Sequence, residues 1–167
     1  MNELRRVLEK SAKEAEQRGE AMRAGDPYRL KFHLMPPAGW LNDPNGLCWF
    51  KGRYHVFFQY SPFDAAGGLK LWGHYASADL LSWEYLGVSI WPDSPQDLHG
   101  VYSGSALEWE GELYLFYTGN VKLEGDYDYI YKGRRADTLC VRSRDGVHFG
   151  HKQVVIRTEE YPKDYTC

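Results

Sequence analysis

An internal repeat constrains the fold of this chain more than any other feature of the sequence. Segments 49–58 and 108–117 align on their Lys-Gly and Glu-Gly pairs, with an offset of 59 residues. A second pair of segments, 77–83 and 143–149, shares the pattern Ser-x-Asp followed four residues later by an aromatic residue. Each copy therefore holds a glycine-centred hairpin and then a strand that ends in a polar bend.

A unit of about four short strands, repeated after about 60 residues, is typical of a β-propeller blade, which cannot bury both of its faces alone. The two units occupy about residues 40–95 and 100–157, and a third begins near Tyr161. The sequence predicts an all-β fold: the N-terminal part of a propeller, with about two blades and the start of a third. The alternative is a chance similarity between two apolar hairpins.

The N-terminal segment predicts an amphipathic helix from Asn2 to about Arg23. Its apolar residues recur at helical spacing, and a Gly-Asp-Pro stop follows at 25–27. We expect an N-terminal helix over 1–26 that docks through a narrow apolar stripe, and an incomplete propeller domain over 27–167. A membrane-surface role for the helix is the weaker alternative, because its polar face mixes charges of both signs.

Composition limits the possible partners and location. A net charge of −3 argues against nucleic acid as a partner, and an aromatic content of 16% suits sugar binding as well as core packing. The three cysteines show no CxxC pattern, and no apolar stretch approaches the roughly 20 residues of a membrane span. The first 25 residues carry charges instead of an apolar signal segment. We expect a cytoplasmic protein with no membrane contact.

The histidines show no metal-ligand spacing and no nucleotide fingerprint is present, so we expect no metal and no other cofactor. The oligomeric state stays open.

Segment 40–46 (Trp-Leu-Asn-Asp-Pro-Asn-Gly) is the most informative stretch for chemistry. Asp-Pro and Asn-Gly both favour a turn, and a turn with no further role is one interpretation. The same stretch also presents a carboxylate (Asp43), an amide (Asn42) and a flat apolar ring (Trp40), which are groups that can hold and attack a sugar. A nucleophilic carboxylate has to be ionised, and a neighbouring amide donor would favour that state.

Five motifs together closely resemble glycoside hydrolase family 32, which includes invertases, fructanases and bacterial sucrose-6-phosphate hydrolases. They are 40–46, 58–60 (Phe-Gln-Tyr), 72–74 (Trp-Gly-His), 77–83 (Ser-x-Asp-Leu-x-x-Trp) and 102–105 (Tyr-Ser-Gly-Ser). The resemblance runs from about His33 to the C-terminus. It implies a five-bladed propeller with the active site in a central funnel, and a retaining hydrolysis of a β-fructofuranoside.

The resemblance also implies roles for individual residues. Asp43 matches the nucleophile that forms a covalent fructosyl-enzyme. The residues that match sugar-contacting or pocket-wall positions are Trp40, Leu41, Asn42, Gln59, Trp72, Tyr102 and Ser103. The expected partner is a small fructoside such as sucrose or sucrose 6-phosphate.

The second carboxyl group that a retaining glycosidase needs is missing from the sequence. In the family it is a Glu in a Glu-Cys pair, beyond an Arg-Asp-Pro motif, and neither motif occurs here. Segment 144–146 (Arg-Asp-Gly) belongs to the repeated bend instead. We therefore expect an N-terminal portion of a family-32 hydrolase that is inactive alone. The alternatives are a non-catalytic carbohydrate-binding fragment and a related arabinan- or xylan-cleaving glycosidase.

A cytoplasmic setting favours sucrose 6-phosphate as the substrate, and a phosphate needs basic partners. The candidates are Lys70, Arg134 and Arg135. A substrate-facing Trp expected between Gln59 and Trp72 is absent, because Ala-Ala-Gly-Gly fills 65–68.

Overall fold

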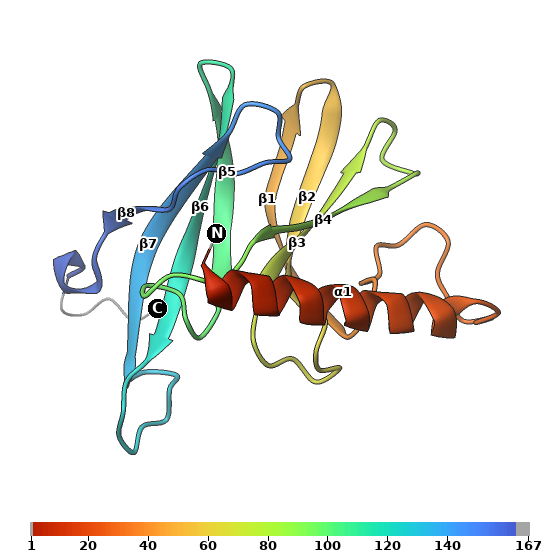
Figure 1. Cartoon of the computed structure of the whole chain (residues 1–167). Coiled ribbons are helices and arrows are strands. Elements are labelled where there is room, and N and C mark those ends of the chain that lie inside the picture. Colours follow the sequence, from red (N-terminus) through yellow and green to blue (C-terminus); the bar gives the residue numbers. More distant parts are fainter. Residues whose placement is uncertain (1, 163–167) are drawn as a thin grey trace.

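The computed structural model describes residues 2–162 and contains one long helix and two four-stranded antiparallel sheets (Figure 1). The first sheet has the order β1-β2-β3-β4 and the second the order β5-β6-β7-β8. The elements are α1 (Glu3–Arg23), β1 (Trp40–Phe50), β2 (Arg53–Ser61), β3 (Leu71–Ser77), β4 (Glu84–Ile90), β5 (Val101–Trp109), β6 (Glu112–Lys122), β7 (Arg134–Ser143), β8 (Gln153–Ile156) and a 3-10 turn, η1 (Thr158–Glu160). The predicted all-β fold with two blade-like units and a preceding helix is confirmed. The start of a third unit lies largely in 163–167, outside the described residues.

The first hairpin of each sheet turns in the same way. Lys51 and Gly52 connect β1 to β2, with φ values of 49° and 78°. Glu110 and Gly111 connect β5 to β6, with φ values of 51° and 78°. Two-residue loops with positive φ at both positions are type I′ turns, whose twist matches that of the flanking strands. The aligned Lys-Gly and Glu-Gly pairs therefore form the same type of hairpin turn.

The Ser-x-Asp bends are also equivalent. The Asp79 carboxylate accepts hydrogen bonds from the backbone N–H groups of Leu81 and Ser82. Asp145 accepts the matching pair from Val147 and His148. The N–H bonds, that of Ser82 first, lower the pKa of Asp79 to about 2. Asp145 therefore has a structural role in a bend, as predicted from the repeat.

One difference between the two bends gives a stability prediction. Leu80 has φ 65°, and the matching residue is Gly146 with φ 79°. A left-handed backbone strains a residue that has a Cβ by roughly 1 kcal/mol, and Leu80 is 52% exposed, so little packing depends on it. We expect Leu80→Gly to raise the free energy of unfolding of the chain by about 0.5–1 kcal/mol in urea denaturation.

The matched control is Leu81→Gly, because Leu81 is also exposed but has no positive φ. That variant should lower the stability by a few tenths of a kcal/mol, since it only makes the unfolded chain more flexible. A Leu80→Gly variant that is no more stable than the parent would show that the bend is unstrained.

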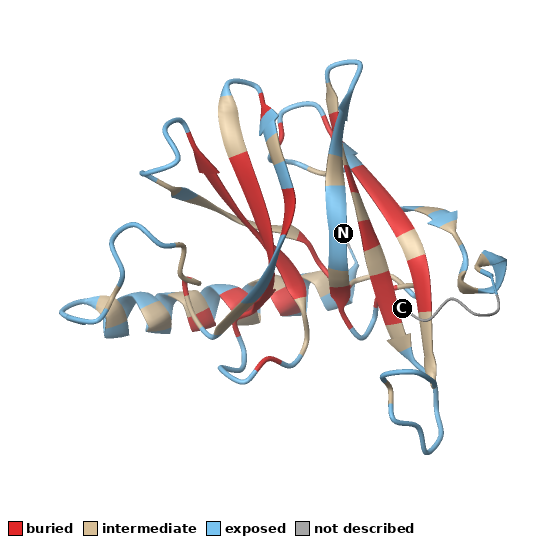
Figure 2. Cartoon of the chain, turned by 180° about the vertical axis from the view of Figure 1, so that it is seen from behind, coloured by how far each residue is buried: buried red, intermediate tan, exposed pale blue. Residues whose placement is uncertain are grey.

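The main core lies between the two sheets. Its largest cluster joins residues from both sheets, among them Phe57 and Trp72 of the first and Leu115 and Tyr117 of the second. Figure 2 shows the buried residues concentrated on the middle strands of each sheet. The two sheets therefore pack face against face, as neighbouring blades do. Each sheet shields the apolar face of the other from water.

Helix α1 packs across the first sheet. Leu8, Ala12 and Ala15 are buried, while Leu4 and Val7 remain exposed, so the docked stripe is narrower than the sequence pattern. The predicted docking is confirmed. Further along, a carboxylate oxygen of Glu16 accepts hydrogen bonds from the hydroxyl groups of two sheet tyrosines, Tyr60 at 3.0 Å and Tyr85 at 2.7 Å. Within residues 2–162, no helix combines the length and the apolar character required to span a bilayer.

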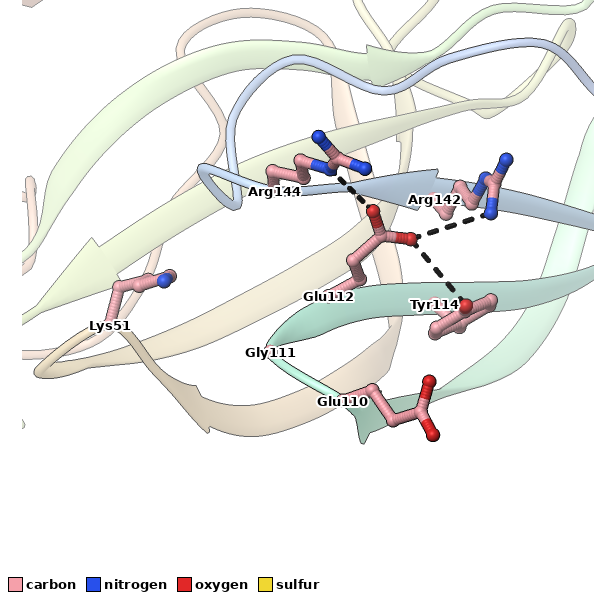
Figure 3. Close-up of a pocket in the computed structure, with 7 residues that line it drawn as sticks. All are labelled: Lys51, Glu110, Gly111, Glu112, Tyr114, Arg142 and Arg144. Atoms are coloured by element: carbon pink, nitrogen blue, oxygen red, sulfur yellow. Dashed lines mark hydrogen bonds and ion pairs between the residues drawn. The ribbon is translucent and has the colours of Figure 1, made fainter.

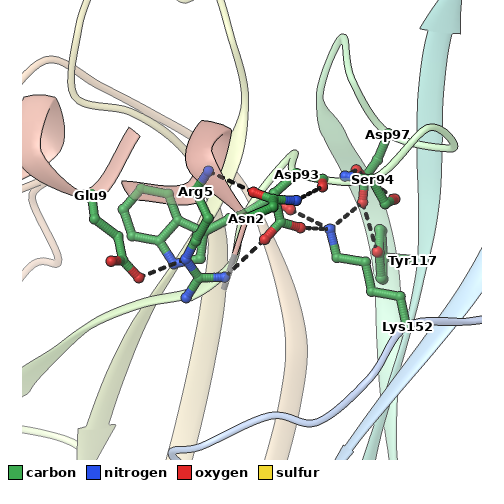
Figure 4. Close-up of polar contacts among 9 residues, drawn as sticks. Asn2, Arg5, Glu9, Asp93, Ser94, Asp97, Tyr117 and Lys152 are labelled. Carbon is green, nitrogen blue, oxygen red and sulfur yellow. Dashed lines mark hydrogen bonds and ion pairs between the residues drawn. The ribbon is translucent and has the colours of Figure 1, made fainter. Parts of the chain in front are cut away.

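The start of α1 also joins the linker between the sheets (Figure 4). Asn2 caps the helix and donates to the Asp93 carbonyl, and Arg5 forms an ion pair with the Asp93 carboxylate at 3.3 Å. Lys152, which directly precedes β8 (Gln153–Ile156), forms ion pairs with Asp93 and with the buried Asp97. This network fixes the linker, and with it the angle between the two sheets.

Candidate active site

The strands β1 and β5 lie side by side (Figure 1). Each of them contains a bulge in its pairing with the next strand of its own sheet. On β1, two residues, Asn42 and Asp43, stand opposite the single residue Gln59 of β2. On β5, Ser103 is the extra residue between the pairs that Tyr102 and Gly104 form with β6. A bulge bends the strand and redirects a side chain. Both functional side chains therefore leave the regular sheet and meet between the blades.

The Asp43 carboxylate is held by one donor on each oxygen. Ser103 Oγ donates to Oδ2 at 2.7 Å, and Asn42 Nδ2 donates to Oδ1 at 3.0 Å. Behind them, the buried Gln59 donates from Nε2 to Ser103 Oγ at 2.9 Å, which directs the serine hydrogen towards the carboxylate. Asp43 itself is exposed. The structure thus brings together four of the predicted site residues and leaves the carboxylate oriented and open.

Asn45 is a further positioning residue that the sequence analysis treated only as part of a turn. It is buried, donates from Nδ2 to the Asp43 carbonyl at 2.7 Å, and accepts from the backbone N–H of Gly104 at 2.9 Å. A Cβ on Gly104 would lie 1.9 Å from the Phe116 carbonyl oxygen, so only glycine allows this approach. Asn45 therefore ties the two bulges together.

Two predicted contact residues have other positions. Trp72 has no exposed surface, so the prediction that it lines the pocket is wrong for this structure. Its indole N–H donates to the Tyr102 carbonyl at 3.1 Å, which fixes β5 from behind. Leu41 is half-buried and packs against the cluster that contains Phe58 and Tyr60. The contact of Leu41 with a sugar stays a prediction.

Trp40 and Tyr102 come shortly before Asp43 and Ser103 on their strands, and the Lys70 side chain contacts both rings. The Lys70 ammonium is 5.2 Å from the Trp40 ring centre and 5.4 Å from that of Tyr102. Gly67 lies against the Trp40 ring, where a Cβ would be 3.7 Å from it. The loop in which a substrate-facing Trp was expected therefore covers Trp40 with glycine and supplies a cation instead.

Arg134 and Arg135, the other predicted phosphate partners, have separate surroundings because neighbours in a strand face opposite ways. The Arg134 guanidinium lies 5.8 Å from the Tyr102 ring centre, on the side of the site. Arg135 donates to the Pro95 carbonyl at 2.7 Å and pairs with the buried Asp137 at 3.6 Å. Arg135 is therefore a structural residue away from the site.

Metal binding has no support in the geometry of the described part. Over residues 2–162, no three His, Cys, Asp or Glu side chains lie close enough together to hold an ion.

Comparison with known proteins identifies the family of this chain. Residues 33–167 match the family model described as the N-terminal domain of glycosyl hydrolases family 32. The chain belongs to this family. It is 44% identical over 161 residues to sucrose-6-phosphate hydrolase of Bacillus subtilis and 42% identical over 140 residues to that of Escherichia coli. The matches cover 96% and 83% of this chain but 32% and 28% of the two relatives, so the chain spans about a third of their length.

Solved family-32 structures superpose on it. Sucrose-6-phosphate hydrolase of Lactobacillus gasseri matches with a TM-score of 0.76 and 38% identity, over 86% of this chain and 28% of that one. A Bombyx mori β-fructofuranosidase matches with a TM-score of 0.74 and 33% identity, over 93% and 32%. A mutant of the Bombyx mori enzyme has been solved with sucrose, and it matches as well. The two sheets are blades of the family's five-bladed propeller, which confirms the fold predicted from the resemblance.

Proposed function

We propose that this chain supplies the nucleophile and the fructosyl-binding side of a retaining β-fructofuranosidase that cleaves sucrose or sucrose 6-phosphate. The observation that carries the proposal is the Asp43 carboxylate, exposed between two blades and held on both oxygens by Ser103 and Asn42. Named relatives that act on sucrose 6-phosphate support the substrate class, as does the sucrose complex of the Bombyx mori enzyme.

In the proposed reaction, an Asp43 oxygen attacks the anomeric carbon of the fructosyl unit. The bond from that carbon to the glucosyl oxygen breaks, and this oxygen takes a proton from a carboxylic acid, which the family carries in a Glu-Cys motif that this sequence lacks. Water then hydrolyses the fructosyl ester with net retention. Ser103 and Asn42 fix the direction of attack, and orientation of this kind accounts for a large share of enzymatic rate enhancement.

A chimera tests the function. This chain replaces the matching segment of the Bacillus subtilis sucrose-6-phosphate hydrolase, to which it is 44% identical. We expect the folded chimera to release fructose from sucrose or its 6-phosphate, with retained anomeric configuration by NMR, while the chain alone binds sugar without releasing product. A folded chimera that cleaves neither compound, or that inverts the configuration, would refute the proposal.

The cytoplasmic location and the absence of nucleic-acid and membrane partners stay predictions.

A further inference from the structure

The second sheet has one covered face and one open face. Along β6, every second residue from 113 to 117 is buried in the core between the sheets, while Tyr114 and Phe116 are half-buried on the other side. Leu107 of β5 pairs directly with Tyr114, and Trp109 follows on the same side of β5. Leu107 is 50% exposed and Trp109 is 59% exposed. We call the surface of these four residues the outer face of the second sheet.

The repeat indicates what kind of surface fits this outer face. With the offset of 59 residues, its members Leu107, Trp109 and Phe116 correspond to Cys48, Phe50 and Phe57 of the first sheet. Phe50 and Phe57 are buried because the second sheet packs on them. Both hairpins turn at equivalent Lys-Gly and Glu-Gly pairs, so the correspondence holds in space as well as in sequence. The outer face of the second sheet therefore has the pattern of a contact between blades, with no second sheet packed on it among residues 2–162.

The first sheet carries the matching surface on its side away from the second sheet. Ala106 and Leu113, on the covered face of the second sheet, correspond to Leu47 and Tyr54 of the first. Leu47 is exposed, and so is Trp49, two residues further on the same side of β1. The Trp49 ring lies edge to face against that of Tyr54, with 4.5 Å between the ring centres. We call Leu47, Trp49 and Tyr54 the outer face of the first sheet. One chain thus carries both halves of a blade contact, on opposite sides.

The charged groups beside the outer face of the second sheet are paired with one another (Figure 3). The Glu112 carboxylate forms ion pairs with Arg144 at 2.6 Å and with Arg142 at 3.5 Å. Both arginine side chains are mostly exposed, as is typical of the polar rim of a protein interface. Covering the apolar residues of this face would therefore remove them from water without burying an unpaired carboxylate.

We propose that the outer face of the second sheet binds the outer face of the first sheet of a second copy of this chain, head to tail. The contact repeats the packing that already joins the two sheets within one chain. Leu107 and Trp109 of one copy lie against Leu47 and Trp49 of the next, and tryptophan is a common anchor of protein interfaces. Because the two faces differ, the contact is heterologous, and an open assembly keeps one face of each kind free for a further copy.

Sedimentation velocity of the 167-residue chain measures the association. We expect the average mass to rise with concentration and to reach at least about twice the monomer mass at about 100 µM. Trp109→Lys and Trp49→Lys should each weaken the association at least about thirtyfold, because each places a charge in one of the two faces. The matched control is Tyr131→Lys, which also replaces an exposed aromatic residue by lysine but lies in the β6–β7 loop, outside both faces. Circular dichroism checks that each variant is folded.

A mixture of the two variants tests whether the contact is head to tail. The Trp109→Lys copy keeps an intact outer face on its first sheet, and the Trp49→Lys copy keeps one on its second sheet. Each variant alone should therefore be largely monomeric, while an equimolar mixture should form a 1:1 dimer and nothing larger. If Trp109→Lys dissociates and Trp49→Lys does not, two identical faces are in contact and the proposal is overturned.

Two further outcomes would contradict the proposal. A parent chain that stays monomeric at about 100 µM would leave the outer face of the second sheet to a further sheet of a longer chain. Association that neither tryptophan variant weakens would place the contact elsewhere on the molecule. Leu107→Glu and Leu47→Glu repeat the experiment at exposed positions of the same two faces if a tryptophan variant loses its fold. None of these measurements depends on catalysis, so their outcome leaves the proposed function unaffected.

Discussion

In the active chimera, Asp43→Asn is expected to lower kcat for fructoside cleavage by on the order of 10⁴-fold or more, because an amide cannot form the fructosyl ester. The substitution preserves the shape of the side chain, and Ser103 Oγ, 2.7 Å from Oδ2 in the parent, can still donate to the amide oxygen. The protein should therefore fold normally, with unchanged circular dichroism and thermal midpoint, and initial rates of glucose release measure the loss.

The control for this variant is Asp126→Asn, an exposed aspartate of the β6–β7 loop. It removes the same charge and should leave the rate within about twofold. A second measurement identifies the nucleophile directly: mass spectrometry of protein quenched during turnover should find the fructosyl adduct on the peptide that contains Asp43. An Asp43→Asn protein that retains several per cent of the activity, or an adduct on another residue, would remove Asp43 from this role.

Acidification should destabilise the chain through a buried histidine pair. His55 Nε2 lies 3.1 Å from the Phe50 carbonyl, which can only accept, so His55 carries its proton there. Its Nδ1 then accepts from His74 Nε2 at 2.8 Å, and His74 Nδ1 is buried without a partner among the described residues. Both rings must stay neutral in this arrangement.

Burial, followed by the neighbouring His55 and Arg53, lowers the pKa of His74 from 6.5 to about 3. Above pH 6.5 the His74 ring is neutral in both the folded and the unfolded chain, so its titration does not change the free energy of unfolding there. As the pH falls from 6.5 towards 3, only the unfolded chain takes up the proton, and the free energy of unfolding should fall by on the order of 4 kcal/mol. Urea titrations at a series of pH values measure this loss.

His74→Gln keeps an N–H donor for His55 but cannot titrate. It should be less stable than the parent at about pH 7.5, because the ring stacked on Phe57 at 4.1 Å is lost, yet its stability should depend much less on pH below about 6.5. His33→Gln, at an exposed position, should keep the parent's pH dependence. An acid limb equally steep in the His74→Gln variant and the parent would assign the effect to other groups.

The repeat could be predicted from the sequence because it is marked by short local patterns. A glycine in a two-residue hairpin and an aspartate that accepts neighbouring N–H groups are determined by short-range geometry, so the turns at 51–52 and 110–111 and the bends at Asp79 and Asp145 could be predicted. Segment 40–46 located the carboxylate, and the family resemblance supplied its expected role.

Long-range packing decided what the sequence could not show. The burial of Trp72 depends on how the second sheet packs on the first, and so does the exposure of Leu107 and Trp109 on the other side of the second sheet. Neither follows from residues close in the sequence. Asn45 was hidden for a similar reason: its two hydrogen bonds join bulges on strands some 60 residues apart, while Asn-Gly by itself indicates only a turn.

The bulges at Asp43 and Ser103 occupy equivalent places in the two sheets. Pro44, after the first bulge, pairs with Phe58, and Gly104, after the second, pairs with Tyr117. Phe58 and Tyr117 are themselves 59 residues apart, the offset of the aligned hairpins. Rotational pseudosymmetry thus brings the bulge of the first strand of each blade to the central axis. In the first blade the bulge carries a carboxylate, and in the second it carries a hydroxyl group. A ring of such blades can surround a small molecule with different chemical groups while its backbone plan stays the same.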